Sequence, residues 1–114
     1  MYGDELSVPV LRTRCEESRT VVRFSVAGEV DIATSRRLAD ALRQAIALAS
    51  ADRPLTVDLR DVTFLGAAGL RVLVTAQAAC AAEDIRMLVV ADHAAVLRPI
   101  TVSGVAELLT VVPR

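Results

Sequence analysis

Few side chains in this 114-residue sequence have the type and spacing that site chemistry requires. The two cysteines, Cys15 and Cys80, are far apart and form no Cys-x-x-Cys pair, and His93 is the single histidine. Zinc-type sites group about four Cys or His ligands at short spacings, so no metal site is predicted. Free thiols are expected, and a Cys15 to Cys80 disulfide is the less favoured alternative.

No pattern typical of catalysis or nucleotide binding accompanies these residues. The sequence has neither a Gly-x-Ser-x-Gly nor a Gly-x-x-x-x-Gly-Lys motif, and His93 has no serine or cysteine at a recognisable spacing. We therefore predict that the protein is not an enzyme and has no cofactor. His93 is interpreted as a surface or helix-capping residue.

Composition excludes further classes of function. Thirteen basic and fourteen acidic residues give a formal net charge of -1, and no basic stripe is present to follow a phosphate backbone. With only three aromatic residues (Tyr2, Phe24 and Phe64), no base-stacking surface is expected either. No apolar run approaches the roughly 18 residues of a membrane span, and the N-terminus does not resemble a signal peptide, so a cytoplasmic location is predicted.

The first half of the chain predicts a β-hairpin followed by a helix. Two β-branched runs, about Leu6 to Arg12 and about Thr20 to Val26, flank a polar stretch, and Gly28 is expected to close the second strand. A helical period then runs from Ser35 to Ser50, with its N-cap at Thr34 or at the first residue of the run.

The second half alternates strands and helices. The predicted elements are a central strand over Leu55–Arg60, a helix over Ala67–Ala82 and a strand over Ile85–Val90. A short helix follows, capped by Asp92, and Pro99 is expected to break or kink it. After Gly104, one more turn and a terminal extended segment are expected. A hairpin followed by β/α alternation predicts an α/β fold: one domain over residues 1–114, with helices packed on a mixed β-sheet.

Three stretches in register resemble one family. They are GEVDIATSRRLADAL (Gly28 to Leu42), VDLRDVTFLGAAGLRVLV (Val57 to Val74) and LRPITVSGVAELLTV (Leu97 to Val111). Together they resemble the STAS domain of bacterial anti-sigma factor antagonists. This resemblance implies a regulator that binds an anti-sigma factor with a kinase-like ATPase domain and so promotes sigma-factor-dependent transcription.

In that family a serine at the start of the second helix is phosphorylated, and its charge of about -1.5 to -2 expels the partner. The family pattern Asp-Ser-Ser-Gly or Asp-Ser-Thr-Gly reads Gly66-Ala67-Ala68-Gly69 here, so Ala67 stands at the phosphoacceptor position without a hydroxyl. Only backbone N–H groups and the helix dipole remain at this turn. Either the chain is fixed in its binding-competent form or the old binding surface has decayed.

The resemblance assigns partner binding to two segments. One is the Gly66 to Gly69 turn, with Arg71 as a rim contact. The other is the loop of Glu29, Asp31 and Thr34, in which Asp31 alternatively orders the following turn. Phe64 is predicted to lie in the core. The alternative function is a non-enzymatic accessory subunit of a lipid-transport ATPase, and a weak homodimer is left open.

Overall fold

A computed structural model describes residues 11–113. Five strands, three helices and one 3-10 turn follow in the order β1 (Arg12–Glu17), β2 (Val22–Val30), α1 (Ser35–Leu48), β3 (Leu55–Leu65), α2 (Ala67–Ala82), β4 (Met87–Val90), α3 (Ala94–Ser103), the turn Ala106–Leu108 and β5 (Val111–Val112). The α/β class is confirmed. Within residues 11–113 no helix is long and apolar enough to cross a membrane, and no group of three or more potential metal ligands gathers.

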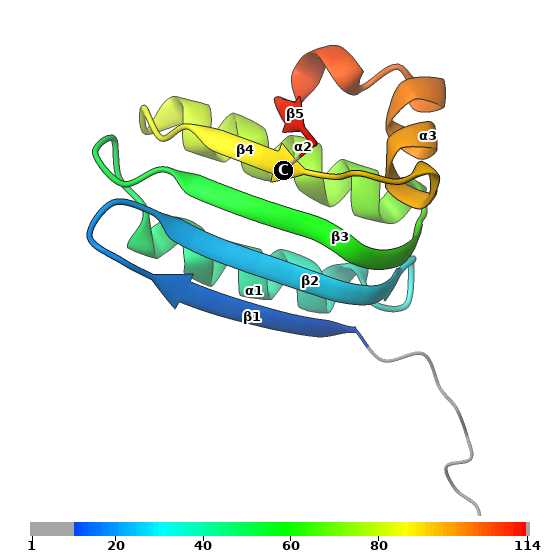
Figure 1. Cartoon of the computed structure of the whole chain (residues 1–114), viewed down its shortest axis with the longest axis horizontal. Coiled ribbons are helices and arrows are strands. Elements are labelled where there is room, and N and C mark those ends of the chain that lie inside the picture. Colours follow the sequence, from blue (N-terminus) through cyan, green and yellow to red (C-terminus); the bar gives the residue numbers. More distant parts are fainter. Residues whose placement is uncertain (1–10, 114) are drawn as a thin grey trace, which may run out of the picture.

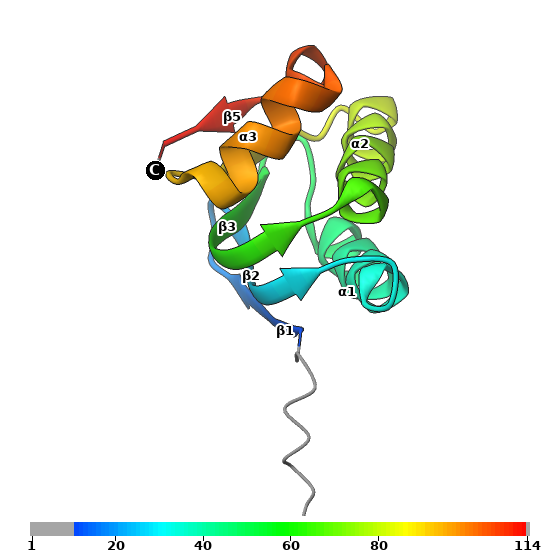
Figure 2. The same cartoon turned by 90° about the vertical axis from the view of Figure 1, so that its right-hand side faces the viewer.

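The strands form a single sheet in the order β1-β2-β3-β4-β5, with β3 at its centre (Figure 1). The β1–β2 pair is antiparallel and the other pairs are parallel, which confirms the mixed sheet. Viewed from the end of the sheet, α1 and α2 lie next to each other on one face (Figure 2). The carboxyl ends of β2 and β3 therefore meet at one edge of the sheet, from which α1 and α2 start.

Strand β1 differs from its prediction. The hairpin is confirmed, but its first strand is Arg12–Glu17, and the residues 6–10 that we assigned to it lie outside the described part of the chain. All six residues of β1, a strand at the edge of the sheet, are exposed. A strand of this kind carries no hydrophobic alternation for sequence reasoning to detect.

Gly28 does not end β2, which continues to Val30. Its backbone has φ 101, and the pairing register with β3 shifts between Gly28 and Glu29. Glycine adopts this conformation without strain, so it accommodates an irregularity inside the strand rather than terminating it. Strand β3 correspondingly runs five residues beyond the predicted Arg60, to Leu65.

The α3 region holds two further corrections. The N-cap is His93 rather than Asp92, and Pro99 lies inside a helix that continues to Ser103. Burial of Val96 and Ile100 on either side of Pro99 holds the helix together despite the lost backbone hydrogen bond. Gly104, in the left-handed conformation (φ 82), ends α3 as predicted.

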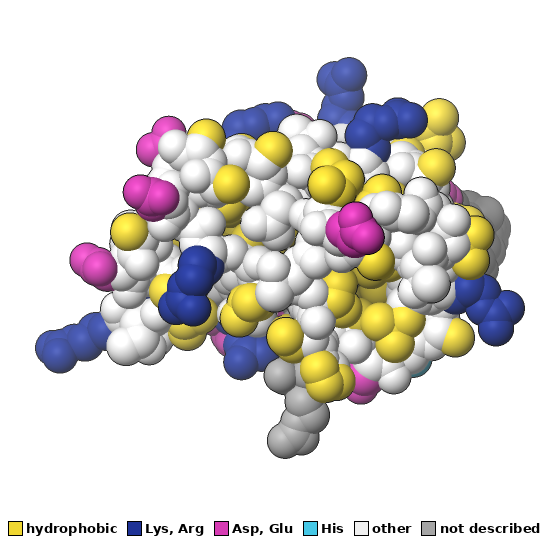
Figure 3. All heavy atoms as spheres, turned by 90° about the horizontal axis from the view of Figure 1, so that it is seen from above, with side chains coloured by type: hydrophobic (Ala, Val, Ile, Leu, Met, Phe, Trp, Pro, Cys, Tyr) yellow, Lys and Arg dark blue, Asp and Glu magenta, His cyan; other side chains and the backbone are white. Residues whose placement is uncertain are grey.

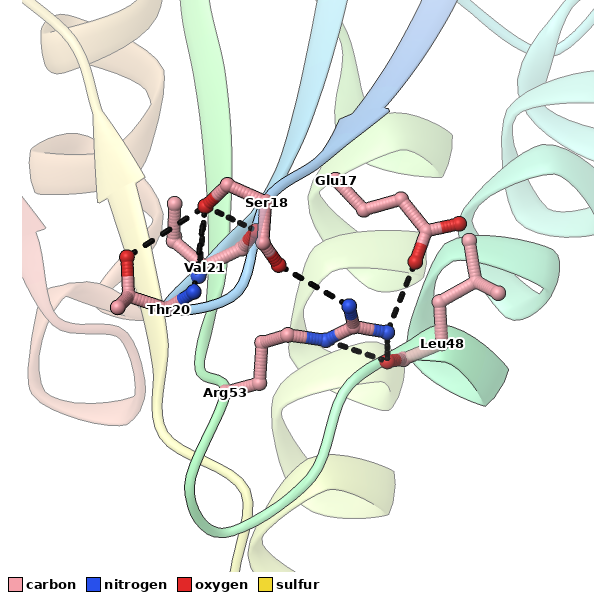
Figure 4. A network of polar contacts seen from close by, with 6 residues as sticks. All are labelled: Glu17, Ser18, Thr20, Val21, Leu48 and Arg53. Carbon is pink, nitrogen blue, oxygen red and sulfur yellow. Dashed lines mark hydrogen bonds and ion pairs between the residues drawn. The ribbon is translucent and has the colours of Figure 1, made fainter.

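Arg53 holds together the edge of the sheet opposite the carboxyl ends of β2 and β3 (Figure 4). Its guanidinium donates to the carbonyl of Leu48 (Nη2, 2.7 Å) and to that of Ser18 (Nη1, 3.0 Å), and it pairs with Glu17 at 2.8 Å. One side chain thus connects the end of α1, the β1–β2 turn and the start of β3.

Asp58 of β3 is expected to make the stability of the fold depend on pH. Hydrogen bonds from Arg60 (2.8 and 3.0 Å), helped by the charges of Arg60 and Arg23, outweigh partial burial and hold the pKa of Asp58 below its ordinary value. A lowered folded-state pKa stabilises the protein above the unfolded pKa of about 3.9, and this stabilisation is lost as pH falls through the folded pKa. Asp58→Asn is expected to reduce the difference in unfolding free energy between pH 7 and pH 3, measured by urea denaturation. An unchanged difference would contradict this role.

The two thiols are free, as predicted, and lie in different environments. Cys15 is exposed on β1, whereas Cys80 is buried in α2, where burial raises the pKa of its thiol. We expect one thiol to be alkylated in the native protein and both after denaturation, as counted by mass spectrometry. Different mobility on reducing and non-reducing gels would contradict this arrangement.

Candidate functional site

The two segments assigned to partner binding lie together at the carboxyl edge of the sheet. Val30, at the end of β2, pairs with Leu65, at the end of β3. The backbone N–H of Gly66 donates to the carbonyl of Val30 at 2.8 Å, which joins the start of α2 to the loop before α1. Residues more than 30 positions apart in the sequence thus form one surface.

The loop between β2 and α1 is built by two side chains. The Asp31 carboxylate accepts hydrogen bonds from the backbone N–H groups of Ala33 (2.9 Å) and Thr34 (3.1 Å), so Asp31 orders the turn. The hydroxyl of Thr34 accepts from the N–H of Asp31 (3.0 Å) and donates to the carbonyl of Glu29 (2.9 Å). Thr34 is buried and supports the loop from inside, while its assignment as a contact residue stays a prediction.

Thr34→Val is expected to destabilise the fold and loosen this loop. The substitution keeps the shape of the side chain but removes the hydroxyl, which leaves the Asp31 N–H and the Glu29 carbonyl without their partner, a cost of about 1–3 kcal/mol. Thermal melts of Thr34→Val and of the control Thr34→Ser, which keeps the hydroxyl, test this. Equal melting temperatures for the two variants would contradict it.

The turn before α2 presents backbone rather than functional side chains. Gly66 is the N-cap, with extended backbone and no side-chain cap, and its carbonyl accepts from the N–H of Leu70 at 3.0 Å. Ala67 is exposed and Ala68 is partly buried, so the phosphoacceptor position faces solvent with a methyl group. The helix runs over Ala67–Ala82 as predicted.

Gly69 is a packing residue. It is buried, and a Cβ placed on it would lie 2.4 Å from Cγ1 of Val30 and 2.8 Å from Cδ1 of Leu65. The absence of a side chain lets α2 approach the ends of β2 and β3. Gly69 therefore positions the surface by its packing, and its assignment to partner binding stays a prediction.

Arg71 is exposed on the first turn of α2, as a rim contact requires. It borders a groove of about 530 Å³ between α1 and α2 that Ala68 and Ser35 also line. The groove opens next to the turn, so Arg71 flanks the same surface.

Phe64 contradicts its prediction as a core residue, since its side chain is 50% exposed. It lies between the buried residues Val62 and Leu65 near the end of β3, and its ring lies over Gly66: a Cβ on that glycine would be 3.1 Å from Cε2 of the ring. Ile32, in the loop before α1, is 86% exposed and was not singled out by sequence reasoning. The alternation of buried residues along β3 ends at Leu59, so no sequence signal marks either Phe64 or Ile32 as exposed.

His93 joins α3 to the same region. Its Nε2 lies 2.7 Å from the carbonyl of Val62, and its Nδ1 lies 3.3 Å from a carboxylate oxygen of Asp92. Its backbone carbonyl accepts from the N–H groups of Val96 and Leu97, which confirms a capping position. The histidine thus fixes the start of α3 against β3.

Known proteins share this fold and sequence. A family described as Mlab, STAS domain, matches residues 13–111. The anti-sigma-F factor antagonist RsfB of Mycobacterium tuberculosis, in strains CDC 1551/Oshkosh and ATCC 25618/H37Rv, is 37% identical over 86 residues, or 74% of this chain. The match spans 66% of the relative, just under two thirds of its length.

Solved structures of anti-sigma factor antagonists have the same fold as this chain. An anti-sigma factor antagonist from Mycobacterium paratuberculosis superimposes with a TM-score of 0.83 and 30% identity, covering 92% of this chain and 87% of that one. SpoIIAA, an anti-sigma factor antagonist solved in its unphosphorylated form, has a TM-score of 0.70 and 14% identity over 90% of both chains, a likeness of fold alone. With a family match over nearly the whole described chain and relatives of 30% and 37% identity, the protein belongs to the STAS domain family.

Proposed function

We propose that this single-domain protein is a cytoplasmic anti-sigma factor antagonist, a regulatory binding protein rather than an enzyme. It binds an anti-sigma factor through the carboxyl edge of the sheet and so promotes sigma-factor-dependent transcription. The observation that carries this proposal is the similarity over 92% of the chain to a mycobacterial anti-sigma factor antagonist, at 30% identity.

The proposed partner is an anti-sigma factor with a kinase-like ATPase domain. SpoIIAA has been solved in a phosphorylated form, which shows that a protein of this fold carries such a modification. Here Ala67 offers no hydroxyl, so binding at this turn is not switched by phosphate. The loop bonds of Asp31 and Thr34 and the close packing at Gly69 favour a retained surface over a decayed one.

The alternative, an accessory subunit of a transport ATPase, is not supported by the relatives whose roles are named, which are anti-sigma factor antagonists. Titration calorimetry with each purified anti-sigma factor of the source organism tests the proposal, and saturable binding to one of them is expected. Binding to none, together with co-purification of a transporter ATP-binding subunit from native cells, would overturn it.

A kinase assay tests whether the turn before α2 lacks a phosphorylation site. Incubated with the partner and ATP, the wild-type chain is expected to carry no phosphate on the turn, whereas Ala67→Ser restores a hydroxyl at an exposed helix start and is expected to be phosphorylated there. Peptide mapping locates the phosphate. Modification of wild type at Ser35, Thr63 or Thr75 would show that the chain uses a different switch.

A further inference from the structure

Two large hydrophobic side chains are exposed at the edge that the proposed function uses. Ile32 is 86% exposed and Phe64 is 50% exposed. Ile32 follows β2 by two residues, and Phe64 is the last residue but one of β3, whose end pairs with the end of β2. With Gly66 and the exposed methyl group of Ala67, these residues form what we call the Phe64 patch.

Gly66 controls where the Phe64 ring lies. A Cβ at position 66 would be 3.1 Å from Cε2 and 3.6 Å from Cζ of the ring, and 3.6 Å from the Val30 carbonyl oxygen. The ring therefore covers the space that a side chain at position 66 would occupy. Because the backbone of Gly66 is extended (φ -92, ψ -179), other residues fit there without strain, so the role of this glycine is to leave room for the ring.

Two carboxylates border the patch on the side of β2, while Arg71 flanks the turn on the side of α2. Glu29 is the pairing partner of Phe64 across the β2–β3 ladder and has no ion pair among residues 11–113, and Asp31 begins the loop that carries Ile32. An exposed apolar group on a rigid element with a charged rim is the usual form of an interface anchor.

We infer that Phe64 and Ile32 are the anchor residues of the partner contact, inserting into an apolar recess on the anti-sigma factor that is bordered by Lys or Arg facing Glu29. By setting the position of the ring, Gly66 determines which shape of recess Phe64 fits. The inference rests on the proposed function. It implies that the chain replaces a polar, switchable contact with an apolar one.

Affinity measurements with single variants test the anchors. Titrated against the anti-sigma factor that binds wild type, Phe64→Ala and Ile32→Ala are each expected to weaken binding about tenfold or more. Val102→Ala and Leu108→Ala are matched controls, because these side chains are 79% and 55% exposed at the end of α3 and in the following 3-10 turn. Figure 3 views the upper face of the molecule, with hydrophobic side chains in yellow. Both controls are expected to bind within about twofold of wild type.

A double-mutant cycle tests the role of Gly66. Gly66→Ala pushes the ring by a few tenths of an ångström and is expected to weaken binding more in the wild-type background than in the Phe64→Ala background, because the shifted group is then absent. Equal effects in both backgrounds would overturn the role of Gly66. Thermal melts establish that every variant is folded.

The outcomes separate the two proposals. If wild type binds an anti-sigma factor and the Phe64 and Ile32 variants bind equally well, the anchors are wrong while the proposed function stands. If wild type binds none of the anti-sigma factors, the proposed function fails and the anchors fail with it.

Discussion

Ala67→Asp is expected to weaken binding of the anti-sigma factor about ten- to a thousandfold. The substitution places a full negative charge on an exposed position at the start of α2, inside the proposed contact surface. Desolvating an unpaired charge in an interface costs on the order of a few kcal/mol. The fold itself should tolerate the change, because a carboxylate in the first turn interacts favourably with the helix dipole.

Ala51→Asp is the matched control, since it makes the same substitution at an exposed residue of the turn between α1 and β3, at the other edge of the sheet. Arg37→Ala would be a poor control, because Nη2 of Arg37 donates to the carbonyl of Leu11 at 3.1 Å. Titration calorimetry of wild type and both aspartate variants, with melts of each, gives the comparison. Unchanged affinity of a folded Ala67→Asp variant would exclude this surface and favour a decayed site.

Gly69→Ala is expected to be the most destabilising single-methyl change at the site. The new Cβ would lie 2.4 Å from Val30 and 2.8 Å from Leu65, both buried at the ends of their strands, so either α2 or the strand ends must move. Overpacking of this kind costs about 1–3 kcal/mol, and each kcal/mol lowers the melting temperature of a domain of this size by roughly 4–8 °C.

Gly104→Ala separates this effect from the general cost of losing a glycine. Gly104 has φ 82, and no neighbouring atom lies within 4 Å of the position that a Cβ would take, so its substitution strains the backbone without crowding a neighbour. Both variants should melt below wild type, but only Gly69→Ala should also weaken partner binding, because it displaces Val30 and Leu65 next to the turn. A Gly69→Ala protein with wild-type stability would show that the packing around α2 is looser than the structure indicates.

Helix α2 was predictable because its apolar period is long and begins directly after a glycine turn. The central position of β3 in the sheet was also predictable, because the strand is apolar enough to be covered by helices. Strand β1 was not, since its six exposed residues have no buried face to pattern. The path of α3 through Pro99 was missed because burial of Val96 and Ile100, a tertiary effect, overrides the local preference of proline.

The candidate site shows the same division. Sequence comparison brought the loop of Glu29 and Asp31 and the turn at Gly66 into one prediction, and the structure places them together. It could not separate contact residues from supporting ones, because Thr34 and Gly69 owe their roles to distances across the β2–β3 edge. Phe64 was assigned to the core from its residue type, whereas its exposure follows from the strand register.

The methyl group of Ala67 also has a consequence for the timing of the response. A serine at this turn would let a kinase and a phosphatase adjust activity within the lifetime of one molecule. With alanine there, and under the proposed function, the fraction of anti-sigma factor occupied follows the total concentration of this chain. The signal would then rise at the rate of synthesis and decay at the rate of proteolysis and dilution by growth, with a threshold where the two proteins reach equal numbers.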